Sequence, residues 1–350
     1  MPSSASPRVV TLRDVAHAVG VSPASVSLAL RNDPRISEAR RLEIQAAAQK
    51  MAYRPNPSAT ALAHAKRNAI HQPIHATLAW LNLWSEPEKL RQLKEFDAYW
   101  RGALAAAEKA GYRLEEFVAN DRLPVSRLEK ILLARGITGL LLPPHRTQPE
   151  WERFDWGRFS IVRFGRSVEH PAAYVVTADH VANMMVAMAE IQRRGYARIA
   201  FVAEPADKRW YLFEAGFLMA QQKIPESRRL PIFRVNKGAP TTSQQAMEAW
   251  LKKYKPDAVV TSIAETPGML RKAGYRVPAD IGIAVMSVLD GNADSGIDQN
   301  PEEIGRAAVE TLIGLIYGRQ CGIPEYRRDI LVRGRWVDGN TMPSRSSLEK

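Results

Sequence analysis

The chain has 350 residues, of which 45% are hydrophobic and 25% are charged, so it is long enough for more than one compact domain and too apolar to be disordered throughout. Its formal net charge is +12. Residues 1–67 hold ten lysines and arginines and four acidic residues, so half of the excess positive charge lies in the first fifth of the sequence. This distribution predicts an acidic partner, either nucleic acid or a membrane surface.

Several classes of protein are disfavoured by what the sequence lacks. The first ten residues have no apolar core of signal-peptide length, and no run of about 18 apolar residues occurs, so no membrane partner is expected. A lone Cys321 rules out an internal disulfide and fits a reducing compartment. No phosphate loop, dinucleotide-binding glycine motif or metalloprotease motif is present. We therefore expect a cytoplasmic protein that is not an enzyme, with no catalytic residues, no cofactor and no metal.

Three short helices are predicted in the first fifty residues. In the first, apolar residues recur at i, i+3, i+4 and i+7: Leu12, Val15, Ala16 and Val19. Thr11 supplies a capping oxygen, Gly20 favours the positive φ at which helices end, and Pro23 suits the first position of a second helix. A third helix is expected over residues 38–52, capped by Ser37.

Two short helices joined by a glycine turn and supported by a third are typical of a helix-turn-helix, whose second helix lies in the DNA major groove. The outward residues of the second helix are mostly small: Pro23, Ala24, Ser25, Ser27, Leu28 and Arg31. Small side chains permit a close approach to DNA, whereas a solvated helix usually presents glutamates and lysines. The alternative is a small helical bundle that only caps the rest of the chain.

The stretch over residues 11–63, TLRDVAHAVGVSPASVSLALRNDPRISEARRLEIQAAAQKMAYRPNPSATALA, resembles the DNA-binding head and hinge of the lactose-repressor (LacI/GalR-type) family. The resemblance implies that base edges are read by Pro23, Ala24, Ser27 and Leu28. It implies contacts with the DNA backbone from Thr11, Ser22, Ser25, Arg31, Ser37 and Tyr53. Further DNA contacts are expected from Leu12, Asn56 and Ala59.

The residues at the predicted base-reading positions are unsuited to direct readout of bases by hydrogen bonds. Pro23, Ala24 and Leu28 cannot form the bidentate hydrogen bonds that arginine, glutamine or asparagine form with bases. Discrimination at these positions must then come from contacts with thymine methyl groups or from DNA shape.

A hinge is predicted after the third helix. Asn56 can cap and Pro57 can start a helix of about seven residues, which is too short to be stable alone. Similarity to the family implies that Leu62 from each of two subunits wedges into the minor groove and bends the DNA. The alternative is an ordinary linker that happens to contain a leucine.

From residue 76 onward, short apolar runs alternate with helical patterns, which predicts parallel sheets with helices on both faces. Strands are expected at 77–83, 113–117, 139–142, 160–164, 198–202, 258–261 and 282–287. Helices are expected near 88–110, 125–135, 180–194, 211–223, 243–254 and 301–317. The fold class is thus an all-α helix-turn-helix head followed by an α/β body.

The body more weakly resembles the two-lobed periplasmic-binding-protein-like core of the same family, in GITGLLLP, GYARIAFVAE, AGYRVPADIGIAVMS and DQNPEEIGRAAVETLIGLI. The chain is expected to cross three times between lobes. The predicted domains are a head at 1–55, a hinge helix and linker at 56–73, a core at 74–339 and a disordered tail at 340–350. Within the core we expect lobe one at 74–201 and 299–320, and lobe two at 202–298 and 321–339.

The resemblance implies a small-molecule effector between the lobes, with carbohydrates and related compounds as candidates. The usual arginine and aspartate of that site are replaced here by Phe213 and by Ser287 and Val288, with Asp290 following. Asp179 matches a family position but is equally suited to capping the next helix. Trp84 could stack on a ligand, although a core tryptophan is the stronger interpretation. The effector-binding candidates are Trp84, Asp179, Phe213 and Asp290. Because the usual charged groups are missing, either the effector is atypical or the pocket has lost its ligand.

A DNA-binding regulator accounts for the head, hinge and body together. We expect it to be a repressor that binds a palindromic operator on double-stranded DNA. A homodimer is expected, because each head occupies only half of a palindromic site. A solute-binding protein for transport would share the body but not the head, and an enzyme of the doubly wound class would need a catalytic constellation that the sequence does not show.

Overall fold

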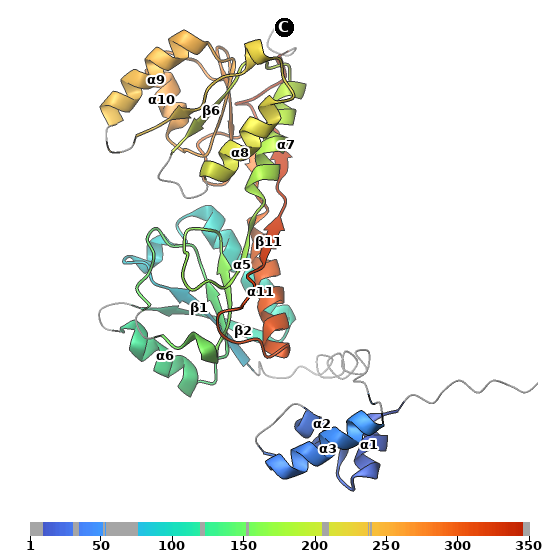
Figure 1. Ribbon diagram of the computed structural model, residues 1–350. Coiled ribbons are helices and arrows are strands. Elements are labelled where there is room, and N and C mark those ends of the chain that lie inside the picture. Colours follow the sequence, from blue (N-terminus) through green and yellow to red (C-terminus); the bar gives the residue numbers. More distant parts are fainter. Residues whose placement is uncertain are drawn as a thin grey trace, which may run out of the picture. The chain divides into compact units, whose positions relative to one another are not determined.

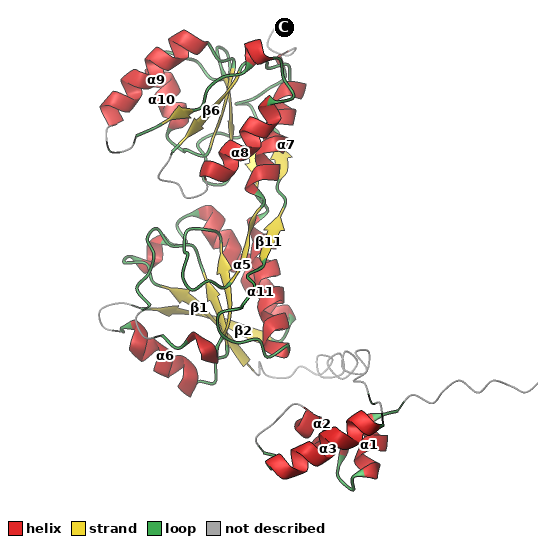
Figure 2. Cartoon of the chain, in the orientation of Figure 1, coloured by secondary structure: helices red, strands yellow, loops and turns green. Residues whose placement is uncertain are grey.

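The computed structural model describes residues 10–30, 35–51, 53, 76–119, 123–151, 154–204, 210–236, 238 and 240–345. The chain divides into two compact units, Met1–Pro73 and Ile74–Lys350, which we call the head and the body. Each unit is described by itself below. Helices and strands are labelled in Figure 1, and their distribution between the two units is clear in Figure 2.

The head consists of three helices around one small apolar core. The helices are α1 (Leu12–Ala18), α2 (Pro23–Leu30) and α3 (Glu38–Lys50). Their buried side chains come from all three helices: Val15, Ala16, Val26, Ala29, Ile44 and Ala48. The predicted third helix ends at Lys50 rather than at residue 52. The helical spacing of the apolar residues therefore produces the packing that the sequence predicts.

The first sheet of the body is six-stranded and entirely parallel, in the order β11-β5-β4-β3-β1-β2. Its strands are β1 (Ala76–Asn82), β2 (Tyr112–Val118), β3 (Gly139–Leu142), β4 (Ser160–Phe164), β5 (Tyr174–Ala178) and β11 (Asp329–Val332). Side chains of α5 (Lys94–Lys109) and α11 (Pro301–Tyr317) pack on one face, and those of α6 (Val125–Ala134) on the other. Two short 3-10 helices, Pro87–Lys89 and Trp156–Arg158, complete this lobe one.

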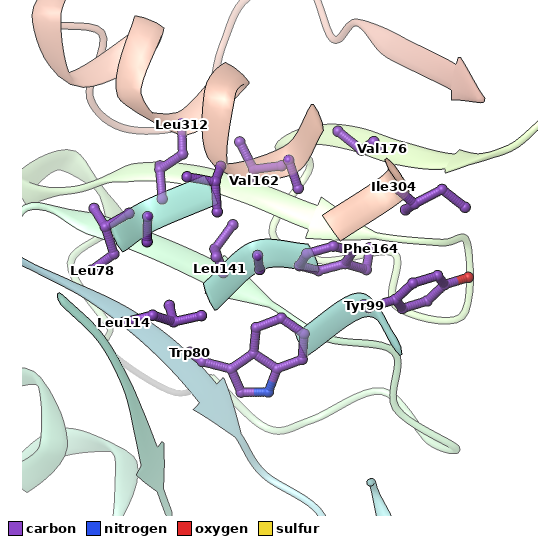
Figure 3. Close-up of a cluster of buried hydrophobic side chains, with 14 of the residues drawn as sticks. Leu78, Trp80, Tyr99, Leu114, Leu141, Val162, Phe164, Val176, Ile304 and Leu312 are labelled. Atoms are coloured by element: carbon purple, nitrogen blue, oxygen red, sulfur yellow. The ribbon is translucent and has the colours of Figure 1, made fainter. Parts of the chain in front are cut away.

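Figure 3 shows the core between this sheet and its first helix layer. Trp80, Leu141 and Phe164 project from neighbouring strands toward Tyr99 of α5 and the apolar residues of α11. The ring centroids of Trp80 and Phe164 are 5.0 Å apart, and those of Tyr99 and Phe164 are 5.5 Å apart. Burial on both faces explains why the central strands are largely apolar, as in the sequence Gly-Leu-Leu-Leu of β3.

The second sheet has the order β12-β10-β9-β8-β6-β7 and is parallel except for the pairing of β10 with β12. Its strands are β6 (Ile199–Ala203), β7 (Phe233–Arg234), β8 (Ala258–Thr261), β9 (Gly282–Val285), β10 (Gly296–Asp298) and β12 (Arg335–Val337). Helices α7 (His180–Arg193) and α8 (Trp210–Gln221) pack on one face. Helices α9 (Pro240–Tyr254) and α10 (Thr266–Lys272) pack on the other, and a 3-10 turn spans Glu226–Arg228. These elements form lobe two.

The chain passes between the lobes three times, after β5, after β10 and after β11. The crossovers are hydrogen-bonded to one another. The backbone N–H of Asp179 donates to the carbonyl of Val332 at 2.8 Å, and that of Gly334 donates to Oδ1 of Asn183 at 2.8 Å. A Cβ at Gly334 would lie 2.6 Å from the carbonyl oxygen of Asp298, so only glycine fits this crossover.

The predicted fold class is confirmed, but the lobe limits need correction. The segment 180–201 belongs to lobe two, because β6 pairs with β8. The segment 329–332 belongs to lobe one, because β11 pairs with β5. Five strands and one helix were not predicted: β5, β7, β10, β11, β12 and α10. Helix α5 begins at Lys94 rather than near residue 88, because the 3-10 turn at Pro87–Lys89 precedes it.

Candidate functional site

Three local devices set the ends of α1 and the start of α2. The backbone N–H of Thr11 donates to Oδ2 of Asp14 at 2.7 Å, while that of Asp14 donates back to Oγ1 of Thr11 at 3.3 Å, which forms a capping box. Gly20 has φ +65°, the left-handed conformation in which helices commonly end. Oγ of Ser22 accepts the N–H of Ser25 at 3.1 Å and so caps the start of α2.

Helix α3 fixes the position of α2 from behind. Nε2 of Gln45 donates to the carbonyl of Ala29 at 2.9 Å, at the end of α2. Nη2 of Arg40 donates to the carbonyl of Val19 at 2.8 Å, at the end of α1. Val26 is fully buried below the turn. The outer face of α2 is therefore presented by a fixed three-helix frame.

The outer face of α2 carries no charged residue within Pro23–Leu30. Pro23 and Ala24 are exposed, whereas Ser27 and Leu28 are half-buried. Arg13 and Arg35 are exposed on neighbouring segments. A small, uncharged helix face beside basic side chains suits contact with a phosphate-lined groove.

The other predicted DNA contacts are only partly described by the structure. Thr11 and Ser22 are exposed and hold the caps given above, and Leu12 packs against the core of the head. Ser37 is the N-cap residue of α3, but its side chain makes no capping hydrogen bond. Tyr53 packs against the core of the head and its N–H donates to the carbonyl of Ala48 at 2.9 Å. Four predicted contacts lie outside the described residues: Arg31, Asn56, Ala59 and Leu62.

A second candidate site is a cavity of about 140 Å³ between the two lobes of the body. Its walls come from the start of α5 in lobe one and from the carboxyl ends of strands in lobe two, where ligands bind in open parallel sheets. The apolar lining residues include Leu93, Phe96, Phe213, Ile263 and Met286, and the polar ones are Glu95, Thr261, Ser262, Ser287, Asp290 and Gln299.

Asp290 joins the lobes across this cavity. Its Oδ1 accepts the backbone N–H of Lys94 at 2.9 Å, and its Oδ2 accepts that of Glu95 at 3.0 Å. These are two of the N–H groups that the first turn of α5 leaves without an intrahelical partner. A carboxylate is favoured there by both the hydrogen bonds and the helix dipole. Asp290 of lobe two therefore acts as a capping residue for a helix of lobe one.

The four predicted effector residues fall into two pairs. Phe213 and Asp290 line the cavity, and Phe213 is fully buried with its ring 4.9 Å from that of His180. Trp84 does not line this cavity; it is 8% exposed in the core of lobe one, and its Nε1 donates to the carbonyl of Pro144 at 2.8 Å. Asp179 caps α7 by accepting the N–H of Ala182 at 3.0 Å. For Trp84 and Asp179 the geometry agrees with the structural alternatives.

The sequence did not single out the polar residues Glu95, Ser262 and Gln299 of the cavity. Glu95 sits in the first turn of α5, and its position at the cavity depends on a helix start that the apolar pattern placed several residues too early. Gln299 follows β10, a strand of only three residues. No local sequence signal marks either residue as part of a site, because their shared cavity depends on long-range packing.

The described residues contain neither a candidate membrane span nor a candidate metal site. Among the helices that the structure describes, none has both the length and the apolar composition of a membrane span. No group of three or more histidine, cysteine or acidic side chains is arranged to hold a metal ion among those same residues.

Two family models match the chain. Residues 11–56 match the model described as bacterial regulatory proteins of the lacI family, and residues 188–341 match that of a periplasmic-binding-protein-like domain. The first match spans the three helices of the head, and the second spans most of lobe two together with α11 and the last two strands.

Similar proteins are named as transcriptional regulators. MalR of Streptococcus pneumoniae is 21% identical over 316 residues, which cover 88% of this chain and 93% of MalR. GntR of Pseudomonas aeruginosa is 26% identical over 339 residues, which cover 89% and 90%. GalR of Escherichia coli is 46% identical over 55 residues, 16% of each chain.

Solved structures share the fold. A complex of the transcriptional regulator CelR with cellobiose has a TM-score of 0.58 at 18% identity and covers 95% of this chain and 99% of CelR. A lac repressor dimer bound to operator and the anti-inducer ONPF has a TM-score of 0.53 at 18% identity and covers 96% and 100%. With its lacI-type head followed by a periplasmic-binding-protein-like body, the chain belongs to the LacI/GalR family of bacterial regulatory proteins.

Proposed function

We propose that this protein regulates transcription by binding a palindromic site on double-stranded DNA as a homodimer, with α2 in the major groove. The observation that carries the proposal is the outer face of α2, which is free of charged residues and held rigidly by α1 and α3. Pro23 and Ala24 at its exposed start allow the helix backbone to come close to base edges. Sequence preference then arises from thymine methyl contacts and DNA shape.

The proposed dimer follows from the geometry of the head. One recognition helix reads one half-site, so a palindrome of two half-sites about one helical turn apart needs two heads. The hinge leucine, Leu62, is proposed to wedge into the minor groove between the half-sites and to bend the DNA. The body is proposed to set the separation of the two hinges according to whether an effector occupies its cavity.

Selection of duplexes from a random pool, followed by gel shift with salt titration, tests the proposal. We expect one palindromic sequence to be enriched and bound saturably. If the protein contacts six to ten phosphates, its affinity for DNA should fall by roughly 10³- to 10⁵-fold as the salt concentration rises from 50 to 200 mM. A protein that shows no preference for any duplex over random competitor would refute the proposal.

The Leu62→Gly variant tests the hinge separately. Loss of an inserted side chain should weaken binding to the selected site far more than binding to random DNA, because only the specific complex holds a bent duplex. Leu42→Gly is a matched control, since Leu42 is 59% exposed on α3. Equal losses of specific and non-specific affinity in Leu62→Gly would argue against a wedge.

A further inference from the structure

Two backbone carbonyls beside the recognition helix α2 are held by side chains of α3 that lie far away in the sequence. Nε2 of Gln45 donates to the carbonyl of Ala29 at 2.9 Å, across 16 positions of the chain. Nη2 of Arg40 donates to the carbonyl of Val19 at 2.8 Å, across 21 positions. Ala29 lies in the last turn of α2, and Val19 is the C-cap residue of α1. Carbonyls at helix ends have no partner within their own helix, so α3 supplies a donor to each of the two helices.

These hydrogen bonds fix the tilt of α2 rather than its depth. Val26 and Ala29 are fully buried, and their apolar packing sets how deep the helix lies. Apolar packing is non-directional, whereas a hydrogen bond weakens steeply when its angle changes. Because Gln45 holds the last turn of α2 and Arg40 holds the end of α1 before it, a change of tilt would strain both bonds. Glu43 in turn orients Arg40, with its Oε2 2.5 Å from Nη1.

The tilt of α2 matters because of the residues that are expected to face the bases. Pro23, Ala24 and Leu28 can reach them only by van der Waals contact. Such a contact loses a quarter to a half of its energy when a gap of roughly 0.5–1 Å opens. The side chains of proline and alanine have no rotamers with which to follow a displaced base. Contacts with phosphates are electrostatic and act over a Debye length of about 8–10 Å, so a small tilt changes them little.

From this arrangement we infer that Gln45 is a positioning residue for sequence recognition. It acts through the backbone of α2 and determines how strongly the protein prefers its site over random DNA. Arg40 holds the neighbouring turn, but its positive charge also attracts phosphates, so Gln45 gives the cleaner test. The inference rests on the proposed function in taking α2 as the helix that reads bases.

The variant Gln45→Met tests the inference in the full-length protein. Methionine is similar in length to glutamine and favours helices equally, but it has no N–H donor. Gln49→Met is the matched control, because it makes the same chemical change at an exposed position of the same helix. Each protein is titrated with a duplex that carries the selected site and with a random duplex of equal length, at one salt concentration.

We expect Gln45→Met to lower the ratio of specific to random affinity by roughly three- to tenfold, the effect of losing one hydrogen bond of typical strength. Its affinity for random DNA should stay within about twofold, because phosphate contacts carry no sequence information directly. Gln49→Met should bind both duplexes as the unaltered protein does. Gln45→Lys restores a donor and should recover most of the lost ratio, with Gln49→Lys as the control for the added charge.

A residue that only stabilises the head would give a different pattern. Partial unfolding of the head lowers the affinity for both duplexes by the same factor, so the ratio stays unchanged. Hydrogen exchange at the amides of α1 and α3 in the full-length protein measures the folded fraction of each variant. If Gln45→Met does not fold, Gln45→Glu takes its place, since a carboxylate keeps the shape but cannot donate. It should lower the ratio by at least as much, relative to Gln49→Glu.

The inference is overturned if the folded Gln45 variant keeps the ratio of the unaltered protein, if it lowers both affinities equally, or if Gln49→Met loses as much of the ratio. Failure here is distinguishable from failure of the proposed function. A preferred duplex that Gln45→Met binds with unchanged preference refutes only the positioning role. An unaltered protein without any preferred duplex refutes the DNA-binding proposal and the positioning role together.

Discussion

The contact between α5 and α11 gives a sharp test of how the cavity is positioned, because two glycines allow these helices to meet. A Cβ at Gly102 would lie 1.9 Å from the carbonyl oxygen of Glu302, and a Cβ at Gly305 would lie 2.1 Å from that of Tyr99. Both obstacles are backbone atoms, which cannot rotate away. Because α5 carries Glu95 and Phe96, this contact also determines where one wall of the cavity lies.

Replacing Gly305 by alanine should therefore destabilise the body. The contact of 2.1 Å must open to at least 3.0 Å, so α5 and α11 would have to separate by about 0.9 Å and lose contacts along the interface. Overpacking of this kind typically costs about 1–3 kcal/mol. The higher helix propensity of alanine offsets up to about 1 kcal/mol of this loss in stability. We expect a net loss of roughly 1–2 kcal/mol in the free energy of unfolding.

Gly314 is a matched control on the same helix, because a Cβ there would meet nothing within 4 Å. Gly314→Ala should gain up to about 1 kcal/mol from helix propensity alone. All eight tryptophans lie between residues 80 and 336, so urea unfolding followed by tryptophan fluorescence reports the body and not the head. If Gly305→Ala were as stable as Gly314→Ala, the close approach of the two helices would be wrong.

Three further predictions follow from individual side chains. Ile44→Ala should lower the free energy of unfolding of the head by roughly 2–5 kcal/mol and abolish DNA binding, without moving the unfolding curve recorded by tryptophan fluorescence. Leu42→Ala should leave DNA binding and the curve unchanged. A shifted curve in Ile44→Ala would mean that the head and the body do not unfold separately. His145 is buried and neutral, with Nε2 accepting the N–H of Leu83 at 3.0 Å, and burial lowers its pKa from 6.5 to about 4. The unfolded chain therefore takes up a proton on His145 below pH 6.5, before the folded chain does. The free energy of unfolding should fall between pH 6.5 and pH 4 by at most roughly 1.4 kcal/mol per pH unit, and it should fall less steeply in His145→Gln. Equal slopes for the two proteins in urea titrations would contradict this. Asp290→Ala should speed hydrogen exchange at the amides of residues 94 and 95 by roughly tenfold, because it removes about 1–2 kcal/mol of helix-capping free energy. Unchanged exchange would show that Asp290 does not hold the lobes together.

The head could be predicted from sequence because its signals are local. Thr11 and Asp14 form the predicted helix start within one turn, and Gly20 adopts the positive φ that ends α1. Pro23 begins α2, as its fixed φ favours. Each device acts over three or four residues, so tertiary contacts do not override it. Leu28 is the exception, since it was expected to face outward and is half-buried.

The body was less predictable because its limits depend on pairing between distant residues. Val175 pairs with Asp329, 154 positions later in the chain, and this pairing alone assigns β11 to lobe one. Strands of two to four residues, such as β7 and β10, contain too few positions for a period to be seen. The cavity combines Glu95 with Gln299 for the same reason. Its lining residues could be identified only after the lobes were in place.

The hydrogen bonds between the lobes set the scale of the free energy that a ligand would need to change their arrangement. Asp298 accepts from Arg335 at 3.0 Å, and Nδ2 of Asn300 donates to the carbonyl of Arg333 at 2.7 Å, so the second and third crossovers are tied together and can act as one hinge. Across the cavity, Asp290 connects the lobes with two hydrogen bonds to backbone N–H groups, which as a helix cap are worth about 1–2 kcal/mol together. A ligand shifts such an equilibrium only by the difference between its affinities for the two arrangements. One hydrogen bond between a ligand and a charged group supplies about 1.5–3 kcal/mol, which is comparable with the Asp290 contact. A ligand that makes one such bond in only one arrangement of the lobes would therefore shift the equilibrium between the two arrangements by roughly tenfold or more.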